Sequence, residues 1–247
     1  MIETATIKNG TESPVGDGEQ GAVRCILLVG EDQRERPAVV KRMELQKVLA
    51  EAFSAVLLIS WGLTVPDPFL IPEGEGLAYG SGDDGYPSLK QRIRYSAALP
   101  PEVRQILLEA ASILSAGFEQ TPLALTCDEA IDNRDRNIGN ILWDGVSTAW
   151  IDHELTLGLG RHMKDANKLA NMAVTAQKHE VIQQSAIAKW MALARENPQQ
   201  ASDMFQSIPE HHGITIAFAE LVAQRLNGLG TRIVSRFPQP KDLLSGL

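Results

Sequence analysis

Short apolar runs separated by polar or glycine-rich stretches fill most of the N-terminal third of the chain, a pattern typical of β-strands joined by loops. Residues 2–8 alternate weakly between apolar and polar, and the run from Val23 to Val29 is apolar enough for a buried strand. Further strands are predicted over 37–43, 69–71 and 77–79. These strands are expected to form a sheet.

One helical segment interrupts the predicted strands. Apolar residues recur at helical spacing from Leu45 to Leu57, which predicts a core-facing amphipathic helix of about four turns. Gly62 follows, and glycine commonly ends a helix because it adopts a left-handed conformation without strain. Glu51 lies near the edge of the apolar stripe, so the pattern leaves open whether its side chain faces a cleft or solvent.

The periodicity turns helical after a flexible, polar run from Gly80 to Gly85. We place a hinge there and predict domains over 1–82 and 83–247. The predicted fold class is α+β with two lobes: a small strand-rich lobe with one helix, and a larger, mostly helical lobe. The helices expected in the second lobe cover residues 89–95, 101–118, 122–131, 163–196, 199–207, 214–227 and 229–236.

A run of Asp, Asn and Arg residues over 132–140 is averse to helix and predicts a loop between packed elements. A hairpin is expected next, because Ile141 to Trp143 and Thr148 to Ile151 are apolar runs on either side of the turn signal Asp144-Gly145. A plain polar surface loop with an ordinary turn is the alternative interpretation.

The hairpin would bring three oxygen-bearing side chains together. Asn140 and Asp152 would lie at the same end of the paired strands, with Asp135 on the loop beside them. Mg²⁺ takes oxygen ligands and shares its other positions with phosphates, so Asn140 and Asp152 are predicted metal ligands. Asp135 would then be free to accept a proton from an attacking hydroxyl.

This spacing matches the kinase catalytic loop, in which an Asp precedes a metal-binding Asn by five positions and a second metal-binding Asp follows a hairpin. Here Asp152 begins Asp-His-Glu, where eukaryotic kinases have Asp-Phe-Gly. The loop more closely resembles that of the HipA-like kinases, bacterial Ser/Thr kinases with the motif Asn-x-Asp-x-x-x-x-Asn, which Asn133, Asp135 and Asn140 reproduce. The Gly-Leu-Thr-Val-Pro of residues 62–66 also resembles that family.

The resemblance implies a kinase-like fold distantly related to the phosphoinositide kinases, with ATP and Mg²⁺ as cofactors and a Ser/Thr protein substrate. Kinases of this family often act as growth-inhibiting toxins paired with a DNA-binding antitoxin, so an antitoxin-like partner is a further expectation. A small-molecule or lipid kinase of related fold, or a nucleotide-binding pseudokinase acting as an adaptor, is the alternative function.

Lys41 ends the predicted strand over 37–43 and resembles the lysine that clamps the nucleotide phosphates in kinases. Its expected partner is Glu51 on the following helix, with Glu44 as the alternative. A solvent-exposed lysine at the end of an edge strand is the plainer interpretation.

Gly16, Gly18 and Gly21 fit the pattern Gly-x-Gly-x-x-Gly-x-Val, in which backbone N–H groups approach phosphates because no Cβ intervenes. A strand follows this motif, whereas a dinucleotide-binding motif needs a helix at that point. Two acidic residues inside the motif would repel a phosphate, and residues 10–14 are an equally good candidate for the phosphate loop.

Arg136 follows the expected base and could bind the transferred phosphate. More often such an arginine ties a loop to a nearby carboxylate, for which Asp128, Glu129 and Asp132 are candidates. His153 and Glu154 follow the expected metal ligand Asp152 and could orient it or bind a second metal, although a packing role fits equally well.

The charge and composition of the chain indicate which classes of binding partner and which cellular environment to expect. The net charge of −8 and the pI near 5.2 disfavour direct nucleic-acid binding, which needs a dense basic surface. No apolar run approaches the ~18 residues of a membrane span, so a cytoplasmic protein without membrane contact is expected. The two cysteines are too few for a disulfide scaffold and are predicted to be reduced.

Overall fold

The N-terminal strands form a sheet that closes on itself. The computed structural model describes residues 2–15, 21–74 and 76–238. Within that part of the chain the larger sheet has the order β1-β5-β6-β4-β3-β2, and β1 pairs with both β5 and β3. Its strands are β1 Glu3–Ile7, β2 Ser13–Pro14, β3 Val23–Val29, β4 Arg34–Lys41, β5 Pro68–Glu73 and β6 Gly76–Gly82. The predicted strands are thereby confirmed, with β4 beginning earlier than expected.

Alternation along the strands gives the sheet one inward and one outward face. In β3, Cys25, Leu27 and Val29 point inward and are buried, while their neighbours are more exposed. They share a small apolar core with buried residues of β1, β4, β5 and β6. The opposite face, which carries Leu70 and Tyr79, packs against the first helix.

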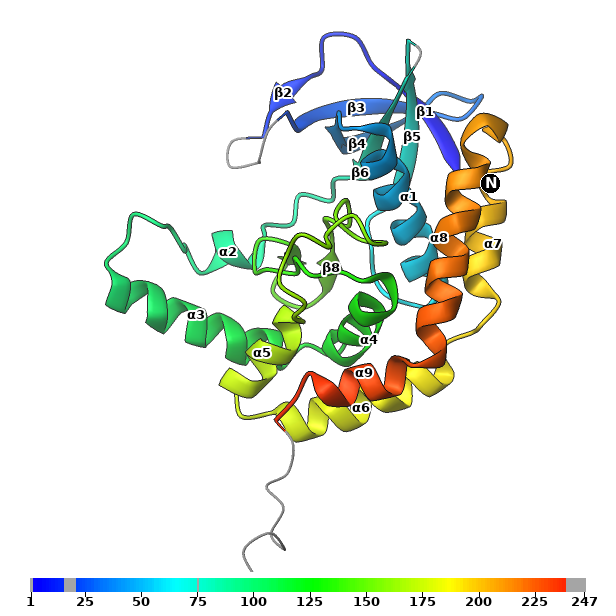
Figure 1. Ribbon diagram of the computed structural model, residues 1–247. Coiled ribbons are helices and arrows are strands. Elements are labelled where there is room, and N and C mark those ends of the chain that lie inside the picture. Colours follow the sequence, from blue (N-terminus) through cyan, green and yellow to red (C-terminus); the bar gives the residue numbers. More distant parts are fainter. Residues whose placement is uncertain (1, 16–20, 75, 239–247) are drawn as a thin grey trace, which may run out of the picture.

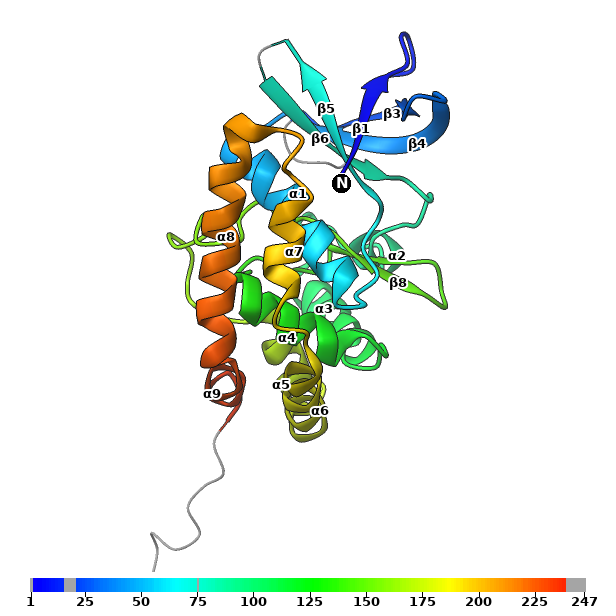
Figure 2. The same cartoon turned by 90° about the vertical axis from the view of Figure 1, so that its right-hand side faces the viewer.

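The helix α1, Leu45–Ser60, lies between the sheet and the C-terminal helices. Figure 2 shows α7 and α8 beside α1, with the strands above them. Because it is covered from both sides, its side chains are buried without a break from Val48 to Leu58. The sequence predicted a single apolar stripe, so this burial extends further around the helix than expected. Gly62, at φ 85°, ends the helix, and the Leu63 N–H donates to the Leu58 carbonyl at 3.0 Å.

Helices dominate the rest of the chain (Figure 1). They are α2 Leu89–Arg92, α3 Pro101–Ser115, α4 Thr121–Ile131, α5 Lys168–Thr175, α6 His179–Ala192, α7 Asn197–Asp203, α8 Pro209–Asn227 and α9 Leu229–Ser235. A short hairpin, β7 Ile141–Trp143 and β8 Thr148–Trp150, follows α4 as predicted.

The continuous helix expected over 163–196 is wrong. The chain is irregular from the end of β8 until Asn167, which caps α5 by accepting from the Ala170 N–H at 3.1 Å. Gln177 then adopts a left-handed φ of 55° and separates α5 from α6. Helical periodicity extends across both interruptions, so spacing alone did not reveal them.

One apolar core runs from α1 into the helical part of the chain. The N-terminus is tied to the same region, since the Ile2 N–H donates to the Met204 carbonyl at 3.1 Å. A domain boundary near residue 82 therefore stays a prediction. No helix in the described ranges is long and apolar enough to cross a membrane.

Candidate active site

The loop after α4 is shaped by its own polar side chains. Asp132 ends α4 in a left-handed conformation, and the Asn133 side chain accepts from the Asp135 N–H at 3.0 Å. From the other end of the loop, Asn140 Nδ2 donates to the Asp135 carbonyl at 3.1 Å. These contacts fix the backbone of Asp135 and leave its carboxylate partly exposed, with 30% of the side chain accessible.

Arg136 anchors this loop from beneath and is fully buried. Its guanidinium donates to both oxygens of the buried Asp128 on α4, at 2.9 and 3.2 Å, and to the Ile151 carbonyl at 2.6 Å. Arg136 therefore ties the loop to a carboxylate, which is one of the two roles considered for it, and its partner is Asp128. Buried as it is, Arg136 has no access to a phosphate.

The hairpin brings Asn140 and the segment before Asp152 together. The Ile151 N–H donates to the Asn140 carbonyl at 3.2 Å, which extends the pairing of β7 and β8 by one step. At the far end, the Asp144 carboxylate accepts from the N–H groups of Val146 and Ser147, both at 2.7 Å, and closes the turn.

Lys41, the last residue of β4, reaches a group of three carboxylates. Its Nζ lies 2.6 Å from Asp152 Oδ1, 3.2 Å from Glu154 Oε2 and 3.7 Å from Glu51 Oε2. Burial alone would lower the pKa of Lys41, but the three negative charges outweigh it and hold that pKa well above its ordinary value. Lys41 therefore stays charged and neutralises part of the negative charge of this group.

Glu51 links this lysine to the segment that carries Asp152. Its carboxylate is buried and accepts a hydrogen bond from the His153 backbone N–H at 2.8 Å. Burial would raise the pKa of Glu51, yet the charge of Lys41 and the hydrogen bonds from His153 lower it. Glu44, the alternative partner for Lys41, is exposed and lies 3.9 Å from Lys47 instead.

His153 continues the chain of contacts to the catalytic loop. It is fully buried, and its Nε2 lies 2.9 Å from the Arg136 guanidinium. Because arginine only donates, this nitrogen accepts, while Nδ1 lies 3.7 Å from Glu51, beyond hydrogen-bond distance. Through its backbone N–H and its Nε2, His153 therefore connects Glu51 with Arg136 and Asp128.

Glu51, Asp152 and Glu154 are also a candidate metal-binding group, with ligand atoms within 4.8 Å of one another. All three offer carboxylate oxygens, the donors that Mg²⁺ prefers. Burial raises the pKa of Glu154, and Lys41 opposes that effect. The donor set fits a hard divalent cation.

A second lysine contacts the expected base. Lys168, at the start of α5, places its Nζ 2.5 Å from Asp135 Oδ1. Sequence reasoning missed this residue, because its position after the capping residue Asn167 carries no catalytic motif.

The solved structures that resemble this chain include a kinase and a toxin of a toxin–antitoxin system. The Helicobacter pylori proinflammatory kinase CtkA superposes with a TM-score of 0.59 at 13% identity, over 94% of this chain and 99% of that chain. HipA of Shewanella oneidensis MR-1, in its toxin–antitoxin complex with HipB and operator DNA, gives a TM-score of 0.56 at 12% identity, over 98% of this chain and 75% of that chain. This chain has the fold of the HipA-like kinases. No protein-family model and no curated protein matches it by sequence.

In this HipA-like fold the glycine-rich segment joins two paired strands. β2, before this motif, pairs with the start of β3, after it. Gly16 and Gly18 lie outside the described residues, while Gly21 has a left-handed φ of 87° before β3 begins. The alternative phosphate loop, residues 10–14, contains Gly10 at φ 77° and runs into β2. The choice between them stays open.

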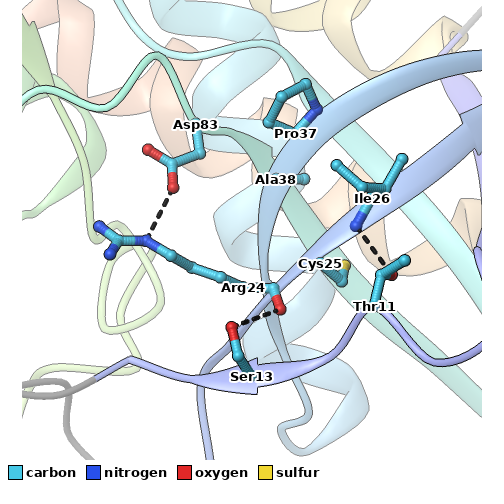
Figure 3. A pocket seen from close by; sticks show the side chains of 8 residues that line it. All are labelled: Thr11, Ser13, Arg24, Cys25, Ile26, Pro37, Ala38 and Asp83. Atoms are coloured by element: carbon cyan, nitrogen blue, oxygen red, sulfur yellow. Dashed lines mark hydrogen bonds and ion pairs between the residues drawn. The ribbon is translucent and has the colours of Figure 1, made fainter.

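A cavity of about 200 Å³ lies beside β2, β3 and the residue after β6 (Figure 3). Arg24 crosses it and pairs with Asp83 at 2.8 Å, and Thr11 and Ser13 line the opposite wall. Arg24 is the register partner of Val39, two residues before Lys41, so their side chains leave the sheet on the same face. The volume is below the ~300–1,000 Å³ typical of pockets that enclose a whole drug-sized ligand.

Proposed function

We propose that this protein is an ATP- and Mg²⁺-dependent kinase that transfers the γ-phosphate to a Ser or Thr hydroxyl of a protein. The observation that carries the proposal is the placement of Lys41 among Glu51, Asp152 and Glu154, next to the loop that presents Asp135. Phosphoryl transfer needs groups that position the phosphates and stabilise charge, and these residues supply both.

Each side chain has one task in this proposal. Lys41 binds the phosphates, and Glu51 holds Lys41 and the backbone of His153 in place. The acceptor oxygen forms a bond to the γ-phosphorus, the bond to the ADP oxygen breaks with its electron pair on ADP, and the hydroxyl proton passes to Asp135. Asp135 suits this task because its carboxylate is partly exposed on a fixed backbone.

Asn140 and Asp152 would hold Mg²⁺, with Glu154 beside them as a further oxygen donor. When bound, the ion would supply positive charge to the phosphate oxygens. Lys41 Nζ lies 2.6 Å from Asp152 Oδ1, so the lysine would share this carboxylate with the ion, and a phosphate group would offer it a second partner.

In the two-lobed arrangement that we propose, the sheet and α1 form the small lobe and ATP lies between it and the helices. The residues after β6 would act as the hinge, and the cavity beside Arg24 and Asp83 would take the base. Gly16, Gly18 and Gly21 would then bind the phosphates, since β3, which follows this motif, leads through β4 to Lys41.

We also propose an antitoxin-like protein partner, because the Shewanella neighbour is in a complex with HipB. That complex contains operator DNA as well, so the expectation that this chain does not bind nucleic acid directly rests on its net charge of −8 alone.

Thermal unfolding with and without Mg-ATP tests the nucleotide site. A ligand that binds only the native state stabilises it by about 2.7 kcal/mol at a hundredfold excess over Kd, roughly 5–10 °C for a chain of this size. We expect this rise in the wild type and in Asp32→Ala, whose exposed carboxylate lies in the turn between β3 and β4, and a much smaller rise in Asp152→Ala. The absence of any rise in the wild type would overturn the proposal.

Transfer itself is tested by incubating the protein with Mg-ATP and dephosphorylated casein and following ADP release and the intact masses of both proteins. A phosphate-sized mass increase supports the kinase. A rise in the unfolding midpoint without ADP release or a mass increase would favour the pseudokinase alternative.

A further inference from the structure

Lys168 and Asp135 are joined by an ion pair that no motif predicts. Lys168 Nζ lies 2.5 Å from Asp135 Oδ1, although the two residues come from α5 and from the loop after α4. Within the described ranges no other basic side chain pairs with Asp135. The neighbouring Arg134 is bound to Asp132 and Arg136 to Asp128. The ammonium of Lys168 is therefore the cation assigned to this carboxylate.

The position of Lys168 is fixed by the residue before it. Asn167 is buried and donates through Nδ2 to the Leu125 carbonyl and to Glu129 Oε1, both on α4. Its Oδ1 accepts from the Ala170 N–H and so caps α5. Asn167 therefore ties the start of α5 to α4, the helix that leads into the loop carrying Asp135. Lys168 is the next residue, so its backbone is held in place.

A second contact holds the segment in front of Asn167 to the same loop. Arg134, the residue before Asp135, donates to the Met163 carbonyl at 3.2 Å. Leu169 and Ala170, directly after Lys168, are buried in the main core. A lysine on a freely moving surface segment would gain little from an ion pair, whereas here the backbone on both sides is already ordered.

We propose that Lys168 is a positioning residue that orients the Asp135 carboxylate for proton transfer, an inference that rests on the proposed kinase function. With Oδ1 held by the ammonium, Oδ2 is left to face the acceptor hydroxyl. A general base needs a defined orientation toward the proton that it takes, and the loop contacts of Asp135 fix its backbone but not its carboxylate. Lys168 supplies the missing constraint.

The test is steady-state kinetics with Mg-ATP and dephosphorylated casein for Lys168→Met, Lys168→Arg and the control Lys164→Met. Lys164 is exposed in the same segment and lies outside the site. We expect Lys168→Met to lower kcat about tenfold or more, with KM for ATP and the unfolding midpoint unchanged. Removal of a general base lowers the rate by ~10²–10⁴-fold, and loss of its orientation should remove part of that contribution. Lys168→Arg should recover part of the loss, and Lys164→Met should match the wild type.

A double-mutant cycle separates positioning from a general structural effect. In the Asp135→Asn background, Lys168→Met should lower kcat no further, because the group through which it acts is already inactive. An equal loss in both backgrounds, or an unchanged kcat in Lys168→Met, would overturn the inference while the wild-type activity upholds the kinase. A wild type that binds Mg-ATP but transfers no phosphate would overturn both.

Discussion

Glu51 Oε2 accepts a hydrogen bond from the His153 backbone N–H at 2.8 Å and lies 3.7 Å from Lys41 Nζ. One buried carboxylate on α1 therefore fixes both the lysine at the end of β4 and the segment that carries Asp152. Since α1 also packs against α7 and α8, its position couples the sheet to the helical part of the chain. The candidate site depends on this helix as much as on the catalytic loop.

Replacing Glu51 with Gln should change how stability depends on pH. Folding lowers the pKa of Glu51 from 4.5 to about 2, so the ionised carboxylate stabilises the wild type. This stabilisation is complete above about pH 4.5 and is lost as the pH falls toward about 2. Glu51→Gln has no such group. We expect urea unfolding free energies of the two proteins to differ most above pH 4.5 and to converge on acidification; parallel curves would contradict this.

Asp135→Asn should lower phosphate transfer by about 10²-fold or more, the usual loss when a general base is removed. The change keeps the shape of the side chain, and the hydrogen bonds to the backbone of residue 135 are unaffected. The Mg-ATP-dependent rise in the unfolding midpoint should therefore persist. Rates of ADP release measure the loss, and an unchanged rate would remove Asp135 from the mechanism.

Arg136→Met should destabilise the protein by ~3–5 kcal/mol, because it leaves the buried Asp128 carboxylate without its cation. Arg34→Met removes an arginine whose side chain is 53% exposed and whose ion pairs lie at the surface. That control should cost no more than ~1 kcal/mol. Urea unfolding measures the loss of unfolding free energy in both variants. Similar losses would show that the buried Arg136 contributes no more to stability than a surface arginine.

Gly230→Ala should destabilise α9, since the new Cβ would clash with the Trp190 ring. That ring is held by a hydrogen bond from Nε1 to the Leu226 carbonyl, so it cannot move away without loss, and overpacking of this kind costs ~1–3 kcal/mol. Gly213, within α8, has open space where an alanine would place its Cβ. Gly213→Ala should instead stabilise by ~0.5–1 kcal/mol, and thermal unfolding of both variants checks the opposite signs.

Elements with local signals could be predicted from the amino-acid sequence. Alternation predicted the strands, helical spacing predicted α1, and the turn signal Asp144-Gly145 predicted the hairpin that sets Asn140 beside Ile151. The resemblance of the Asn133–Asn140 loop motif to that of the HipA-like kinases implied the kinase-like fold, which the solved structures support. The hairpin could be predicted from residues close together in the sequence, because a short turn leaves few ways to arrange the ends of its two strands.

Contacts between distant segments could not be predicted in this way, because they depend on how the folded elements pack. Burial of Glu51 depends on α1 being covered from two sides, which one helix's periodicity does not reveal. The contact of Lys41 with Asp152 joins residues far apart in the chain, and the contact of Lys168 with Asp135 depends on the break at Asn167 that helical spacing concealed. These pairs form because packing of separate elements brings them together, and no short stretch of sequence carries that information.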